Sequence, residues 1–141
     1  MRHKHPENPI IAGSSRDPTQ SYPPTVVKVN GTYFCITKTE TSDLVGFASE
    51  DGINWKEETK HVLKRNISGW DQRKVSSPLL RYDPAYSRYH LYYAGHFPDG
   101  KIAIGYAISE KPLSGYWKLP KNPICAPVDI SDELEGEYNR V

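Results

Sequence analysis

The sequence contains little sulfur, with two cysteines and one methionine among 141 residues. Two cysteines are too few for a disulfide framework, so Cys35, which lies in an apolar run, is expected to be a small buried residue. No long hydrophobic run is present, and the start MRHKHPENP lacks the apolar segment of a secretory signal. These absences argue against a disulfide-rich secreted module and a helical membrane protein, and they lead us to expect a cytoplasmic protein.

Charge of one sign is also lacking, since 18 basic and 17 acidic residues give a net charge of +1. Such a chain has no strong field that would attract nucleic acid or an anionic membrane, so we expect neither as a partner. The sequence shows no Cys and His spacing of a metal site, no phosphate-binding glycine loop and no Gly-x-Ser-x-Gly motif. We therefore expect no cofactor and no metal.

What the sequence does contain is tyrosine, with 10 residues, and proline, with 12, which is typical of a β-rich protein with many turns. The central stretch Val75–Ser109 predicts three successive strands. They are Ser77–Tyr82, Arg88–Gly95 and Lys101–Ser109, and turn residues such as Asp83-Pro84 separate them. The predicted fold class is therefore all-β.

The last of these strands has two unlike faces. One face carries large side chains, and the other carries only Ala103, Gly105 and Ala107. A face built of such small residues must lie close to another layer, so we expect this sheet to be packed on both faces.

The first half of the sequence repeats the same plan. Four pairs of segments match: Pro24–Val29 with Pro78–Tyr82, Tyr33–Thr37 with Tyr89–Tyr93, Gly46–Ser49 with Gly105–Ser109, and Asn8–Ile10 with Asn122–Ile124. Two units of roughly 57 residues, each with four short strands and a late tryptophan, are typical of propeller blades. We predict one propeller unit over the whole chain, with blade one at about 24–63, blade two at about 77–119, and connectors at 8–23, 64–76 and 120–141. Trp55 and Trp117 hold equivalent positions and are expected in the core.

Two blades cannot close a ring. Each blade buries its faces against neighbours on both sides, so a pair leaves two apolar faces bare, and soluble monomers rarely expose large apolar patches. Either the chain is part of a longer one, or several copies close the ring through head-to-tail contacts. We favour self-assembly: three copies would give a homotrimer with six blades, which we prefer, and two copies a homodimer with four.

Blade topology sorts the loops onto two rims. The connector into each first strand and the loop between strands two and three share one rim, which we call the long-loop rim. The remaining tight turns form the short-turn rim. Most charged and aromatic loop residues gather at the long-loop rim, namely Arg16, Asp17, Tyr22, Glu40, Asp43, Trp70, Asp71, Arg73, His96 and Asp99. A functional site is expected there, although long loops are polar in any protein.

Several motifs carry a family resemblance. The segments NPIIAGSSRDP, PPTVVKVNGTYFCITKT and VGFASEDGINW resemble the opening blade of the glycoside hydrolases built on five-bladed propellers. That group includes the arabinanases and xylosidases, the invertases and the mannoside phosphorylases. WDQRKVSSPLLRYDPAYSRYHLYYAGH looks like their second blade. The resemblance covers two of five blades and implies a saccharide as the ligand.

In these enzymes, carboxylates from different blades act as general acid and as nucleophile or base. The resemblance implies Asp17 as the first-blade carboxylate. Asp71 is the second candidate, with Arg73 beside it to keep it ionised. Glu135 is the candidate for the third blade, with Glu133 and Glu137 as alternatives.

The sequence departs from the family pattern at two points. Pro23, and not an aspartate, stands directly before Pro24 at the opening of the first strand, and Leu79 holds the second-blade acidic position. The residues expected to contact a saccharide are Arg16, Tyr22, Trp70, Arg73 and His96. For two of these a structural role is an equal or stronger alternative, because Trp70 either stacks on a sugar or anchors its connector, and His96 is either a ligand or an ordinary hydrogen-bonding residue.

Two functions follow from this pattern. The first is a carbohydrate-active, glycoside hydrolase-like propeller, weakly active or inactive, that binds or hydrolyses glycosides at an axial pocket lined by carboxylates. The alternative is a catalytically silent lectin-like or structural ring, which the missing second-blade and third-blade acidic positions favour.

Overall fold

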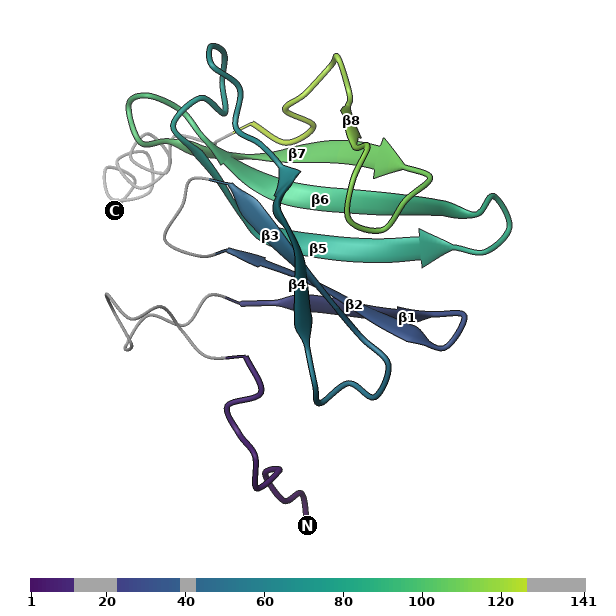
Figure 1. The fold of residues 1–141 in the computed structure, drawn as a ribbon. Coiled ribbons are helices and arrows are strands. Elements are labelled where there is room, and N and C mark those ends of the chain that lie inside the picture. Colours follow the sequence, from purple (N-terminus) through teal and green to yellow (C-terminus); the bar gives the residue numbers. More distant parts are fainter. Residues whose placement is uncertain (12–22, 39–42, 127–141) are drawn as a thin grey trace, which may run out of the picture.

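The computed structural model describes residues 1–11, 23–38 and 43–126, and all regular secondary structure within those ranges is β-strand. The strands form two four-stranded antiparallel sheets that follow one another along the chain. Figure 1 shows the sheets as two stacked layers. This is the all-β arrangement with two four-stranded sheets that the sequence predicted. In the part of the chain that is described, no helix is long and apolar enough to cross a membrane.

Sheet A consists of β1 (Thr25–Val29), β2 (Thr32–Lys38), β3 (Leu44–Ser49) and β4 (Lys56–Leu63), paired in that order. The repeated segments of this half, Pro24–Val29, Tyr33–Thr37 and Gly46–Ser49, fall on β1, β2 and β3. Asn30 and Gly31, with φ of 50° and 84°, form the two-residue turn between β1 and β2. Left-handed backbone at both positions gives a turn whose twist suits an antiparallel hairpin, which is why Asn-Gly predicted it.

Sheet B consists of β5 (Lys74–Asp83), β6 (Arg88–His96), β7 (Ile102–Ser109) and β8 (Trp117–Lys118), again in sequence order. β5 begins three residues earlier than Ser77, the predicted start, because Lys74 pairs with His96 before the register shifts between Ser76 and Leu79. Ser77 lies inside that irregularity with φ of 48°. The polar residues Lys74 and Ser76 concealed this strand extension from a hydrophobic pattern.

The core lies between the two sheets, on what we call their inner faces. Its most buried side chains come from both, and include Ile36, Leu44, Val75, Leu91 and Tyr93, each at most 1% exposed. Cys35 is also buried, at 1% exposure, as predicted, and burial raises the pKa of its thiol to about 11. The sheets meet along β5, which contacts β1, β2 and β3.

The small face of β7 is buried as predicted, with Ala103 at 2% and Ala107 at 0% exposure. At Gly105 the close neighbour is Tyr93 of the same sheet, since a side chain there would meet the Tyr93 hydroxyl oxygen at 2.7 Å. The predicted layer against this face is therefore formed in part by a ring from the adjacent strand.

The prediction for Trp117 was wrong. Its side chain is 55% exposed, because it lies on the outer face of sheet B, which faces away from sheet A. Trp55 is half-buried, and its ring meets Tyr33 edge-on with centroids 6.4 Å apart. The two tryptophans do not hold equivalent positions in the strand pairing, because Trp117 pairs with Ile108 of β7, whereas Lys56 pairs with Ala48, the corresponding residue of β3.

Candidate functional site

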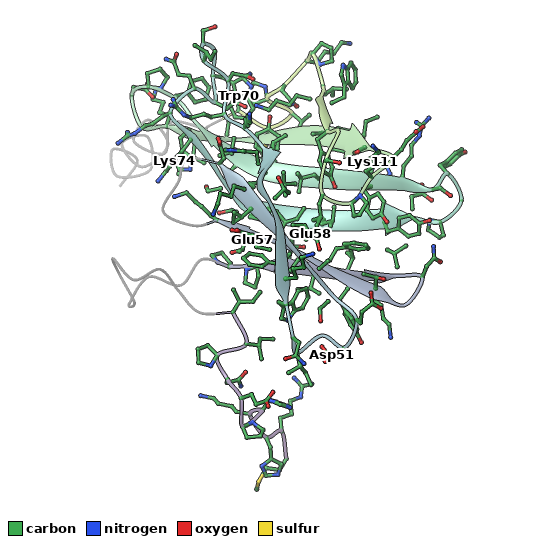
Figure 2. All side chains as sticks on the ribbon, in the orientation of Figure 1. Asp51, Glu57, Glu58, Trp70, Lys74 and Lys111 are labelled. Carbon is green, nitrogen blue, oxygen red and sulfur yellow. The ribbon has the colours of Figure 1, made fainter. Side chains whose placement is uncertain are left out.

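The long-loop rim brings together the end of β2, the start of β5 and the end of β6. Lys74 pairs directly with His96 across β5 and β6, and the positive charges of Lys38 and Lys74 influence one another. Figure 2 shows Lys74 and Lys111 at opposite ends of the strands of sheet B, so Lys74 lies at the long-loop rim and Lys111 at the short-turn rim. The ammonium groups of Lys38 and Lys74 and the imidazole of His96 therefore lie close together at this rim.

His96 is a buried titratable group of this rim, with 8% exposure. Its Nε2 shares a hydrogen bond of 2.8 Å with the Ser76 hydroxyl, and its carbonyl accepts a bond of 3.2 Å from the Arg73 backbone N–H. Burial lowers the pKa of His96, and the nearby charges of Lys74, Lys38 and Arg73 lower it further. The imidazole is therefore mainly neutral at pH 7.

Lys38 is half-buried beside this group. Burial lowers the pKa of its ammonium, and the charge of Lys74 adds to that effect. The rim consequently offers hydrogen-bond donors of three kinds, from ammonium, hydroxyl and imidazole groups. Such a set can hold the hydroxyl or carboxylate oxygens of a ligand.

Trp70 lies against the inner face of sheet B. Its ring stacks on Tyr93, with centroids 5.8 Å apart and planes inclined by 26°, and lies 5.9 Å from the Phe97 ring. Gly95 makes room for it, because a side chain at that position would overlap the indole. These contacts fit the anchoring role that the sequence left open for Trp70, and the ring remains half-buried.

Asp71 is wholly buried, with 0% exposure. Its Oδ2 lies 2.7 Å from Lys118 Nζ and accepts a hydrogen bond of 3.3 Å from the Tyr93 hydroxyl, while the Asn66 backbone N–H donates to Oδ1 at 3.3 Å. The cation that pairs with it is Lys118 of β8, whereas the sequence suggested Arg73. Burial, and then the charge of Asp71, raise the pKa of Tyr93, which keeps its hydroxyl protonated as a donor.

The remaining predicted site residues, Arg16, Asp17, Tyr22 and Glu135, lie outside the described residues. Of the four that are described, the structure joins Arg73 to His96 through the backbone, and places Trp70 and Asp71 together around Tyr93. Sequence reasoning missed Lys38, Lys74 and Ser76. The available signal was that all three lie near the end or the start of a strand at the same rim.

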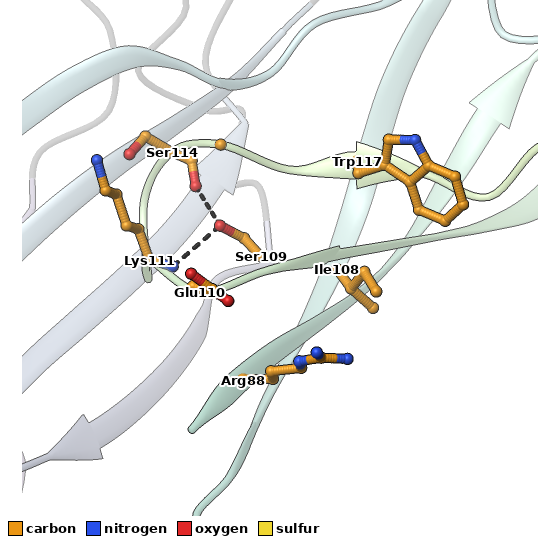
Figure 3. Close-up of a pocket in the computed structure, with 8 residues that line it drawn as sticks. Arg88, Ile108, Ser109, Glu110, Lys111, Ser114 and Trp117 are labelled. Atoms are coloured by element: carbon orange, nitrogen blue, oxygen red, sulfur yellow. Dashed lines mark hydrogen bonds between the residues drawn. The ribbon is translucent and has the colours of Figure 1, made fainter. Parts of the chain in front are cut away.

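A separate open pocket of about 660 Å³ lies at the short-turn rim, where the sequence predicted only tight turns. Arg88, Ile108, Glu110, Lys111 and Trp117 contribute to its lining. Figure 3 shows Trp117 and Ile108 on one side and the turn at Ser109 on the other, where the Ser109 hydroxyl donates to the Ser114 carbonyl. Among the described residues, no three histidine, cysteine or acidic side chains gather to hold a metal.

No protein-family model and no curated protein matches the sequence. Solved structures do match. A thermostable family-43 glycoside hydrolase aligns with a TM-score of 0.57 and 18% identity over 68% of this chain and 31% of its own. The Bacillus subtilis arabinanase aligns with a TM-score of 0.54 and 24% identity, over 67% of this chain and 35% of its own. The Phanerochaete chrysosporium exo-β-1,3-galactanase aligns with a TM-score of 0.62 and 15% identity, over 79% of this chain and 28% of its own.

These matches define the class of fold. The two sheets are β-propeller blades, and their fold is similar to that of part of the five-bladed family-43 glycoside hydrolases, as the motifs suggested. The chain spans only about a quarter to a third of the length of these structures, with 28% to 35% covered in the three named above.

Proposed function

We propose that the protein is a carbohydrate-active, glycoside hydrolase-like propeller that binds or hydrolyses glycosides at a pocket around the propeller axis. The fold likeness supports this proposal, and the matched structures include one with galactose and one with xylose. The axial pocket would open at the long-loop rim, which the described ends of β2, β5 and β6 form in part.

The observation that carries the proposal is the cluster around His96. A neutral imidazole hydrogen-bonded to the Ser76 hydroxyl, flanked by Lys38 and Lys74, offers both donors and acceptors to sugar hydroxyls. Lys74, Ser76 and His96 stand on the paired strands β5 and β6, so that the sheet backbone fixes their spacing, and Lys38 is added from β2 of sheet A. Polar groups on a rigid frame suit specific recognition of a polar ligand.

Hydrolysis would require two carboxylates. Asp17 and Glu135 are the proposed pair, and both lie outside the described residues. In glycosidases a separation of about 5–5.5 Å between the two carboxyl groups gives retention of the anomeric centre, and about 6.5–9.5 Å gives inversion. Asp71 is less suited to this work, since its carboxylate is buried and already paired with Lys118.

The second candidate function is a catalytically silent lectin-like or structural ring. The burial of Asp71 favours this second function. The family's second-blade acidic position is Leu79 here, and its possible substitute Asp71 is buried, so neither position offers an exposed carboxylate. In that case the protein either binds a saccharide at the same rim without hydrolysing it, or has only a structural role as a ring.

Binding is tested by calorimetry with arabino-, xylo- and galacto-oligosaccharides. His96→Gln and Lys74→Gln are expected to weaken the affinity about tenfold or more, since each removes a hydrogen bond to a polar ligand. Lys111→Gln, at the opposite rim, is the matched control and should leave the affinity unchanged. Equal affinities of all three variants and the unmodified chain would contradict the proposed rim.

Hydrolysis is tested with aryl arabinosides, xylosides and galactosides. Turnover that is lost in both Asp17→Asn and Glu135→Gln would support the enzyme. Binding without turnover on any of these substrates would support the lectin-like ring. Neither binding nor turnover would contradict carbohydrate function and leave a structural ring. Asp71→Asn serves as a stability control, because its buried carboxylate is expected to support the fold.

A further inference from the structure

The outer face of sheet B is apolar and bare in the described part of the chain. Four large side chains on it are roughly half exposed: Leu79 at 55%, Ile102 at 51%, Ile104 at 44% and Trp117 at 55%. The rings of Tyr92 and Tyr106 pack against one another between them, with centroids 5.0 Å apart and planes tilted by 36°. A patch of this kind on a folded domain usually marks a contact surface.

The first three strands of the two sheets have the same register over Thr25–Ser49 and Leu79–Ser109, which gives each position of β1–β3 an equivalent in β5–β7. The β1–β2 pairs Val26 with Cys35 and Lys28 with Tyr33 correspond to the β5–β6 pairs Leu80 with Leu91 and Tyr82 with Tyr89. The next strand agrees, since Tyr33 pairs with Ser49 as Tyr89 pairs with Ser109. The outer face of sheet A is thus equivalent to the inner face of sheet B, and the outer face of sheet B to the inner face of sheet A.

The interface inside the chain can therefore serve as a template. In it, the Leu80 backbone N–H of sheet B donates to Thr25 Oγ1 of sheet A at 3.0 Å, so these two positions touch. The equivalent of Thr25 is Leu79, and the equivalent of Leu80 is Val26. Leu79 is 55% exposed and Val26 is 49% exposed, so both are free for a contact of the same geometry.

The same equivalence matches opposite charges. Tyr82 and Val29 belong to the internal interface, in which Val29 is a core residue and Tyr82 packs against the core. Their equivalents on the two outer faces are Lys28 and Asp83. A second interface built on the template would bring this lysine and this aspartate to the same region.

We propose that the outer face of sheet B binds the outer face of sheet A of a second copy, head to tail, with Leu79 of one copy against Val26 of the next. The contact repeats the packing that already joins the two sheets within a copy. Repetition by a constant rotation closes a ring, with three copies giving six blades and two copies four. The second copy would also complete the axial pocket, to which a single copy contributes only two blades.

Sedimentation velocity on the 141-residue chain tests this proposal. The unmodified protein is expected to sediment as a dimer or trimer of its 16.0 kDa chain. Val26→Glu and Leu79→Glu each place a charge on one of the two faces and are expected to shift the mass to that of the monomer. Ile67→Glu is the matched control, because Ile67 is 99% exposed on the connector and should leave the assembly intact.

A mixture of the two variants gives the sharpest result. Each variant keeps one good face, so mixing Val26→Glu with Leu79→Glu should produce a 1:1 dimer that cannot grow. Circular dichroism identical to that of the unmodified chain establishes that both variants are folded. A monomeric unmodified chain would overturn the proposal and leave the face to further blades of a longer chain. An oligomer that persists in Val26→Glu alone, or a mixture that stays monomeric, would overturn the head-to-tail contact.

Discussion

The two faces of sheet B carry side chains of similar character in very different surroundings. Leu79 and Leu80 are neighbours on β5, yet Leu79 is 55% exposed and Leu80 is 3% exposed. The difference arises because sheet A covers the inner face, while no described segment covers the outer face. It shows that the burial of an apolar residue here depends on whether a neighbouring blade covers its face. Substitutions on the inner face should therefore lower the free energy of unfolding more than substitutions on the outer face.

The largest expected effect concerns the charged pair on the inner face. Lys118→Met leaves Asp71 buried without a cation and is expected to lower the free energy of unfolding by about 3–5 kcal/mol. Lys60→Met is the control, since that ion pair with Glu57 is on the surface, where such pairs contribute about 0–1 kcal/mol. Urea denaturation measures both, and equal losses would contradict the assigned burial.

The comparison of faces is sharpened by a matched pair of leucines. Leu80→Ala is expected to cost about 2–5 kcal/mol, as is usual for a large-to-small change in a core. Leu79→Ala, measured at a protein concentration low enough to keep the chain monomeric, is expected to cost about 0.5 kcal/mol or less, as exposed substitutions do. Similar losses for the two variants in urea denaturation would mean that the outer face is also covered within one chain.

A smaller effect is expected from the titration of His96. Its pKa is lowered in the folded state, so below its ordinary value of 6.5 the unfolded chain binds a proton that the folded chain resists. Stability is therefore expected to fall as the pH drops from about 7 towards the lowered pKa, and to level off below it. His96→Gln should reduce that slope in chemical denaturation between about pH 7 and pH 5, and an unchanged slope would contradict the enclosed position of the imidazole.

The smallest effect belongs to an exposed turn of sheet A. Backbone N–H groups of Asn54 and Ile53 donate to Asp51 Oδ1 at 2.8 and 2.9 Å, and these bonds lower the pKa of Asp51. This carboxylate stabilises the fold above its ordinary pKa of 3.8, and the contribution is lost as the pH falls below that value towards the lowered pKa. Asp51→Asn should therefore be less sensitive to acid below pH 4 than the unmodified chain in thermal unfolding, and an equal sensitivity would argue against these hydrogen bonds.

The sequence predicted the strands well where the local pattern determines them. Asn30-Gly31 and Asp83-Pro84 restrict the backbone by themselves, so both hairpins were predictable. The ion pair of Asp71 was not, because Lys118 lies 47 positions away and only the fold brings the two together. Trp117 was misassigned because the sequence equated it with Trp55, whereas its side chain lies on the outer face of sheet B, which no described segment covers.

The candidate site was predictable only as a location. The rim followed from strand order, but the hydrogen bond of His96 to Ser76 depends on the irregularity of β5 that begins at Ser76, and that had no signature in the hydrophobic pattern. Whether Asp17 and Glu135 act as proposed remains a prediction, as they lie outside the described residues.

The central claim, that two copies meet through Leu79 and Val26, is tested most directly by cross-linking. A chain with Val26→Cys and Leu79→Cys, with the exposed Cys125 changed to Ser, should form reducible covalent multimers on oxidation, because a disulfide needs Cα atoms within about 7 Å. A chain with Val26→Cys and Ile67→Cys is the control and should stay uncross-linked. Multimers at the same low level in both chains would contradict the account.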